Sequence, residues 1–172
     1  MENGKPENGA KGTPKISALD AAVKYIASAP RSEKEVREKL YRKGYHKAEV
    51  EEAIARAKGY RFIDDEVYAE NYVEYYGAKL GRKQLEYKLV TEKGIDKELA
   101  RNTVADRISD EDEREKAAEI AASYIRVKRI TERKDLAKVG AYLYRKGFAR
   151  DVIDHTLDAA ARGLGATEQE EF

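Results

Sequence analysis

The 172-residue sequence predicts an all-α fold of three tandem three-helix repeats in an elongated, curved array. Beyond Pro30 the chain has no further proline, and glycines separate stretches whose apolar residues recur at helical spacing. The segment Leu-Tyr-Arg-Lys-Gly-Tyr at 40–45 returns as Leu-Tyr-Arg-Lys-Gly-Phe at 143–148. A weaker middle copy around Gly94 sets the period at about 50 residues. Such a period indicates helical units that pack mainly on their sequence neighbours.

The repeat units divide the chain into segments with expected boundaries. We place a disordered N-terminal tail at 1–15, the three repeats at 16–60, 61–109 and 110–163, and an acidic C-terminal tail at 164–172. The predicted helices occupy residues 17–29, 32–43 and 47–58, then 65–79, 82–93 and 96–108, then 111–129, 132–146 and 149–162. The first tail combines glycine and proline with few apolar side chains, so burial cannot offset its ordering entropy.

Short local motifs predict where the helices begin and end. Ser17 precedes Asp20 by three residues, and Ser32 precedes Glu35 by three, the spacing of a capping box. The helix ends are marked by glycines that each follow a lysine, as expected for a left-handed residue next to a cation near the helix dipole. These glycines are Gly44, Gly94 and Gly147.

Two positions in the second repeat leave alternatives open. Four residues separate Leu89 from Gly94, where the other repeats have three, so either Val90 takes the core position or the helix carries a bulge. The neighbouring Asp64 and Asp65 suggest a cation loop or a helix cap. We favour the cap, because the alternating ligands and distal carboxylate of a calcium loop are missing.

Composition excludes several functional classes. The chain has no cysteine, which removes disulfide scaffolds, thiolate zinc sites and cysteine nucleophiles. It has no apolar run of membrane-spanning length and no signal-peptide pattern at its start, so we expect a cytoplasmic protein without a membrane partner. His46 and His155 have no second ligand at metal-binding spacing, and phosphate loops and serine elbows are absent. We therefore expect no catalytic residue, no cofactor, no metal and no enzymatic activity.

Local charge gives the strongest functional signal. Net charge is only +1, but residues 126–150 hold nine cations against two carboxylates, a local net charge of +7. A solvated face and a surface for a phosphate backbone or an acidic protein both fit this run. The candidate contact residues are Arg126, Lys128, Arg129, Arg133, Lys134, Arg145 and Lys146, with Arg82 and Lys83 in a smaller basic patch. Twelve tyrosines accompany them; we interpret most as half-buried core rings, with stacking on bases or on a partner as the alternative.

Four motifs together resemble the RecX family of bacterial RecA regulators. They are Ser-Glu-Lys-Glu-Val-Arg-Glu-Lys-Leu at 32–40, Phe-Ile-Asp-Asp-Glu-Val-Tyr-Ala at 62–69 with Tyr72-Val73, Lys-Gly-Ile at 93–95, and the segment 143–148. The resemblance covers about residues 17–162, and the departure from the family pattern that matters is the extra residue before Gly94. The motif residues Asp64, Asp65, Gly44, Gly94 and Gly147 are expected to set shape.

The resemblance implies a noncatalytic, monomeric protein that binds RecA in the groove of its filament on single-stranded DNA. It further implies inhibition of recombinase, ATPase and co-protease activities, and therefore a role in DNA repair, homologous recombination and the SOS response. The alternative, from the basic third repeat, is a helical-repeat protein that binds nucleic acid directly.

Overall fold

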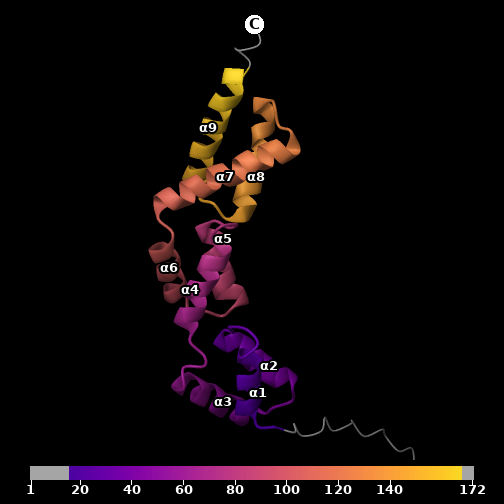
Figure 1. The fold of residues 1–172 in the computed structure, drawn as a ribbon, viewed down its shortest axis with the longest axis vertical. Coiled ribbons are helices and arrows are strands. Elements are labelled where there is room, and N and C mark those ends of the chain that lie inside the picture. The colour runs from indigo at the N-terminus through magenta and orange to yellow at the C-terminus, as the bar shows by residue number, and fades with distance from the viewer. Residues whose placement is uncertain (1–15, 168–172) are drawn as a thin grey trace, which may run out of the picture. The chain divides into compact units, whose positions relative to one another are not determined.

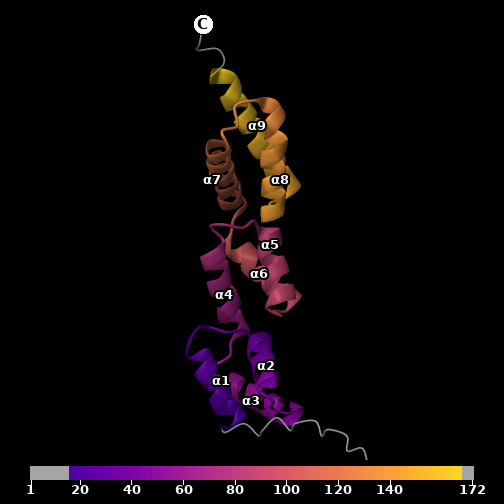
Figure 2. The same cartoon turned by 90° about the vertical axis from the view of Figure 1, so that its right-hand side faces the viewer.

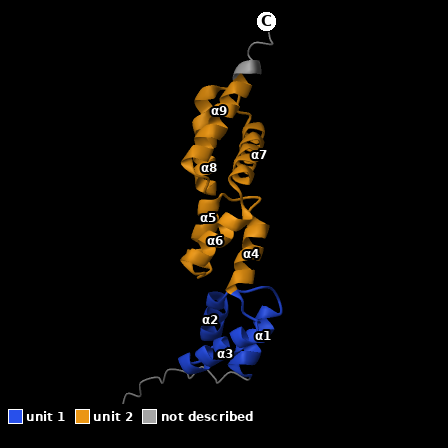
Figure 3. Ribbon diagram, turned by 90° about the vertical axis from the view of Figure 1, so that its left-hand side faces the viewer, with its two compact units in different colours: residues 1–64 blue, residues 65–172 orange. Residues whose placement is uncertain are grey.

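The computed structural model describes residues 16–167, and these residues form nine α-helices, one π-helix and one 3-10 helix without any strand (Figure 1). The all-α prediction is confirmed. The expected N-terminal tail, 1–15, and the last five residues of the expected C-terminal tail lie outside the described residues. The chain divides into two compact units, residues 1–64 and 65–172, each described by itself (Figure 3).

The first unit contains α1 (Ala18–Ile26), α2 (Glu33–Arg42) and α3 (Lys47–Gly59). The predicted caps are present: the Ser17 hydroxyl accepts from the Asp20 amide at 3.0 Å, and Ser32 forms a full capping box with Glu35. All three helices contribute to one apolar core. Its most deeply buried side chains are Ala22, Val36, Val50 and Ala57. The serine caps thus mark the starts of α1 and α2, and the three helices pack around one core.

The second unit begins with α4 (Asp65–Tyr76), α5 (Arg82–Tyr87), η1 (Lys88–Glu92) and α6 (Lys97–Arg107). Here η1 is a π-helix, so the bulge alternative is correct and the core assignment of Val90 is wrong. Leu89 keeps the core position, fully buried, and accepts from the Ile95 amide at 3.0 Å. The widened turn absorbs the extra residue because the buried leucine and the glycine must both keep their places.

The second unit continues with α7 (Asp110–Lys128), η2 (Arg133–Asp135), α8 (Leu136–Lys146) and α9 (Arg150–Thr167). α9 runs five residues past its predicted end at residue 162. A separate apolar core joins α7, α8 and α9. Its buried side chains include Ala117, Val139, Leu143 and Phe148. Figure 2 shows α8 and α9 side by side, with α5 adjoining the end of α8.

The three glycines predicted to end helices all have left-handed backbones. Their φ angles are 91° at Gly44, 72° at Gly94 and 88° at Gly147. Glycine adopts this region without the Cβ clash that other residues meet there. The local prediction from the sequence is therefore confirmed in all three places.

Within the second unit, the start of α5 meets the end of α8 head to tail. The Gly81 amide donates to the Lys146 carbonyl at 2.8 Å, and the Lys83 amide donates to the Gly147 carbonyl at 3.2 Å. The free amides at one helix start thus satisfy the free carbonyls at another helix end. We call this contact between residues 81–84 and 145–148 the junction. A Cβ added to Gly81 would lie 2.5 Å from the Gly147 carbonyl carbon, so the two backbones touch.

Candidate interaction surface

The basic residues of the third repeat form a group at the connection between α7 and α8, which we call the basic tip. Arg129 ends α7 with a left-handed backbone (φ 52°), and its amide donates back to the Arg126 and Ile125 carbonyls. Ile130 is buried beneath the turn. This turn leaves all five side chains of the basic tip exposed. They are Arg126, Lys128, Arg129, Arg133 and Lys134.

Most of the positive charge at the basic tip is unpaired. Lys134 pairs with Glu132 at 2.6 Å, and Lys138, just beyond the tip, pairs with Asp135 at 2.7 Å. The hydrogen bond from Lys138 holds the pKa of the Asp135 carboxyl below its ordinary value. The other four tip cations make no ion pair with any described residue. The tip therefore presents free cations for an anionic partner.

The structure does not gather all the candidate cations at one place. Arg145 and Lys146 lie at the far end of α8, separated from the basic tip by the helix length of about 15 Å. They lie at the junction instead, close to Arg82 and Lys83. Arg145 is exposed, whereas Lys146 is half-buried with its Nζ 5.5 Å from the centre of the Tyr142 ring. The candidate cations predicted from the sequence thus form two separate groups, one at the basic tip and one at the junction.

Arg82 is engaged inside the protein. Its Nη1 donates to Asp110 at 2.7 Å, its Nε lies 3.4 Å from Glu113, and its amide donates to Glu113 Oε1 at 3.2 Å. The Glu113 side chain is only 6% exposed and Arg82 is half-buried, so this pair is a partly buried link between the second and third repeats. The geometry gives Arg82 a structural role at the junction. Lys83 remains exposed beside it.

The acidic start of α7 also serves the fold. Asp110 and Glu113 hold Arg82, while Asp112 completes a capping box with Ser109. The Ser109 hydroxyl and amide donate to the Asp112 carboxylate and lower its pKa. Four carboxylates in the first turn also favour the positive end of the helix dipole. This acidic run therefore stabilises the start of α7 and pairs with Arg82.

The twelve tyrosines divide into buried, half-buried and exposed rings. Tyr45 and Tyr72 are buried, as predicted for core rings. Five more rings are half-buried, so seven of the twelve are buried or half-buried, as expected for most of them. The half-buried tyrosines are Tyr25, Tyr68, Tyr76, Tyr124 and Tyr142. The exposed tyrosines are Tyr41, Tyr60, Tyr75, Tyr87 and Tyr144, with Tyr144 the most exposed at 74%. The sequence did not show which rings are exposed, because a ring beside a core position can rotate to either side.

The paired aspartates lie where a helix cap was expected. α4 begins at Asp65, directly after Asp64, and neither residue is without an interaction partner. Across the described range 16–167, no group of three His, Asp or Glu side chains comes close enough to hold a metal ion. None of the helices in that range is both long and apolar enough to cross a membrane.

A cavity of about 380 Å³ lies beside the junction, between the ends of α4 and α6 and the start of α7. Val73, Ile108 and Phe148 form part of its apolar wall. Its arginines already have carboxylate partners: Arg107 pairs with Glu70 at 2.8 Å, and Arg82 with Asp110 and Glu113. The cavity therefore separates two packed repeats and carries no convergent set of free polar groups.

Two family models match the chain in the regions of its outer repeats. The model for the RecX first three-helix domain matches residues 18–56, and the model for the RecX third three-helix domain matches residues 110–157. Helices α1–α3 and α7–α9 occupy these two regions. The repeat visible in the sequence thus coincides with a known domain pattern.

Curated relatives and solved structures agree with these models. Regulatory protein RecX of Clostridium botulinum (strain Alaska E43 / Type E3) is 33% identical over 149 residues, covering 84% of this chain and 69% of the relative. Its Bacillus licheniformis counterpart is 30% identical over 138 residues, covering 79% and 52% respectively. The crystal structure of RecX from Lactobacillus salivarius matches with a TM-score of 0.72 and 28% identity, over 83% of this chain and 93% of that one. A second RecX crystal structure matches with a TM-score of 0.75 and 25% identity, over 82% and 71%.

Proposed function

Because this chain belongs to the RecX family of regulatory proteins, we propose that it binds RecA and its filament on single-stranded DNA as a noncatalytic inhibitor. It lies in the filament groove as a monomer and lowers recombinase, ATPase and co-protease activity. In the cytoplasm this restrains homologous recombination, DNA repair and the SOS response.

The observation that carries the proposal is the basic tip. Four of its five cations are exposed without an ion-pair partner in the described structure. Free arginines on a rigid turn suit a carboxylate-rich protein surface, because the guanidinium binds carboxylates through two hydrogen bonds. The last turns of α2 and α8 supply two further exposed arginines, Arg42 and Arg145.

The test is a titration of the protein into the single-stranded-DNA-dependent ATPase and strand-exchange reactions of RecA. We expect inhibition at or below equimolar protein, with no ATP hydrolysis by the protein alone. The variant Arg126→Glu/Arg133→Glu reverses two tip charges and leaves the left-handed Arg129 in place. It should inhibit at least tenfold more weakly. Unchanged RecA activity over a wide titration of folded protein would reject the proposal.

A matched control separates the site from total charge. Lys97→Glu/Arg101→Glu makes the same charge change on α6, where both side chains are exposed and unpaired within the described structure. This control should inhibit like the wild type. If it weakens inhibition as much as the tip variant does, overall charge accounts for the effect and the basic tip has no specific role.

The second candidate function is direct binding of nucleic acid, which the unpaired arginines and lysine of the basic tip also favour. Free single-stranded DNA would then bind with a salt slope of about −0.7 per phosphate contact, and the tip variant would flatten that slope. We favour RecA docking because the whole chain has a net charge of only +1, which gives little long-range attraction to DNA.

A further inference from the structure

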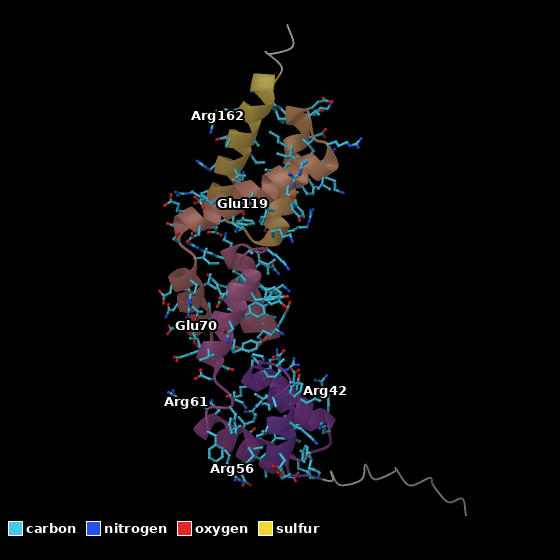
Figure 4. All side chains as sticks on the ribbon, viewed as in Figure 1. Arg42, Arg56, Arg61, Glu70, Glu119 and Arg162 are labelled. Carbon is cyan, nitrogen blue, oxygen red and sulfur yellow. The ribbon has the colours of Figure 1, made fainter. Side chains whose placement is uncertain are left out.

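The chain carries one exposed surface element twice. Tyr41 and Arg42 lie on the last turn of α2, and Tyr144 and Arg145 lie at the same positions on α8. The tyrosine rings are 42% and 74% exposed, and both arginines are exposed. Figure 4 labels Arg42, whose side chain extends away from α2. Each unit of the protein therefore holds one copy.

The fold does not require this identity. Between residues 32–58 and 135–161, the only positions exposed in both copies that share a residue are Tyr41 with Tyr144 and Arg42 with Arg145. Other doubly exposed positions differ, such as Glu38 against Ala141. Packing explains why the buried leucine and the left-handed glycine recur, but it does not explain an exposed ring.

Local helix chemistry accounts for only part of the pattern. A cation in the last turn of a helix is favoured by the dipole, yet lysine would serve equally well. Neither Tyr41 nor Tyr144 makes a side-chain hydrogen bond or a ring contact with any described residue. In the second repeat, Val90 and Thr91 follow the core Leu89 instead. The element therefore occurs in the two outer repeats and is missing from the middle one.

We propose that the Tyr-Arg pairs on α2 and α8 are two equivalent docking elements for the same acidic site on two subunits of one protein filament. The inference rests on the proposed function, because a RecA filament repeats one subunit surface along its length. Each tyrosine packs on an apolar patch of the partner, and each arginine pairs with a carboxylate beside it. Two weak contacts then combine through effective concentration.

The chemistry of the element favours a protein partner. Tyrosine and arginine are among the residues that dominate protein–protein binding energy. A strand of nucleic acid would be tracked by a continuous basic groove, whereas these are two separate single-turn elements with one ring each. Free single-stranded DNA is therefore the competing occupant that the experiment must exclude.

The experiment measures binding of the full chain to RecA filaments on single-stranded DNA, to unassembled RecA and to single-stranded DNA alone. The variants are Tyr41→Ala/Arg42→Ala, Tyr144→Ala/Arg145→Ala and the combined fourfold change. On filaments we expect each pair variant to bind about a hundredfold more weakly, by loss of avidity. On unassembled RecA each should lose only about twofold, since one of two equal sites remains. The fourfold variant should lose binding to both.

The matched control is Tyr87→Ala/Arg101→Ala, which removes an exposed tyrosine and an exposed arginine elsewhere and should bind like the wild type. Loss confined to one pair variant, equal losses on filaments and unassembled RecA, or a matching loss on DNA alone would each overturn the inference. A fourfold variant that binds filaments normally overturns this inference but leaves the proposed function standing. A wild type that binds neither form of RecA overturns the proposed function as well.

Discussion

The turn at residues 40–45 and the turn at residues 143–148 have nearly the same sequence and the same local geometry. In each, the residue after glycine donates its amide to the buried leucine, at 3.3 Å from Tyr45 to Leu40 and 3.2 Å from Phe148 to Leu143. Gly44 and Gly147 have φ angles within a few degrees of each other. Helix C-caps of this kind need only local hydrogen bonds and a glycine.

Their surroundings differ. A Cβ on Gly44 would meet no atom within 4 Å among the described residues, whereas a Cβ on Gly147 would lie 2.3 Å from Gln84 Cβ and 2.4 Å from the Gln84 amide nitrogen. One turn is an open helix end, and the other is half of the junction. A local sequence can therefore encode a turn, while a distant segment decides whether that turn is also a packing surface.

The largest effect is expected from Gly147→Ala, compared with Gly44→Ala. Both substitutions force a residue with a Cβ into the left-handed region, which costs about 1–2 kcal/mol. Only Gly147→Ala also drives that carbon into Gln84, which adds about 1–3 kcal/mol of overpacking. Urea denaturation of each variant should show the larger loss at Gly147. Equal losses would mean that the junction yields without strain.

Gly81→Ala separates the cost of the left-handed backbone from the cost of overpacking at the junction. Gly81 has an ordinary φ of −76°, but its added Cβ would lie 2.5 Å from the Gly147 carbonyl carbon. The loss of unfolding free energy in Gly81→Ala should therefore come from crowding alone. It should be close to the difference between the losses in Gly147→Ala and Gly44→Ala.

Breaking the junction from its polar side should have an intermediate effect. Glu113→Ala leaves the Arg82 guanidinium and amide without their buried carboxylate, and we expect a loss of about 2 kcal/mol in unfolding free energy. Glu119→Ala is the control, because it removes only a surface pair with Lys116 and should cost less than about 1 kcal/mol. Similar losses in both variants would contradict a specific role for the Arg82–Glu113 pair.

The smallest effect concerns the residue after each glycine, Tyr45 in the first turn and Phe148 in the other. The Tyr45 hydroxyl donates to the Ile16 carbonyl at 2.7 Å, and burial raises its pKa above the ordinary value near 10. Tyr45→Phe should cost about 1 kcal/mol at pH 7 through the lost hydrogen bond.

The pH dependence of that difference has a definite sign. Because the folded pKa of Tyr45 is raised, its contribution is intact below pH 10 and is lost as pH rises above that value, where the unfolded chain ionises first. Unfolding free energies of wild type and Tyr45→Phe should therefore converge above pH 10. A constant difference from pH 7 to 11 would show that Tyr45 ionises equally in both states.

The sequence names the cations of the candidate surface, and their role as contact residues stays a prediction, but their arrangement came from the fold. The sequence identified the cationic residues, but it grouped Arg145 with Arg126 although α8 separates them. It also named Arg82 as a candidate contact residue, which stays a prediction, and gave no sign that Asp110 and Glu113 pair with it. Ion pairing between residues about 30 positions apart leaves no periodic mark in a sequence, so this pairing became visible only in the fold.

The helical class, the serine caps and the left-handed glycines follow from local sequence, because each depends on residues within one or two helical turns. The burial of Leu89 rather than Val90 depends on packing, since the packed core selects which side of a widened turn faces inward. Packing also decides that Gly147 meets Gly81 and that Tyr144 stays exposed. Those outcomes depend on segments far apart in the chain, whose contacts form only when whole helices pack.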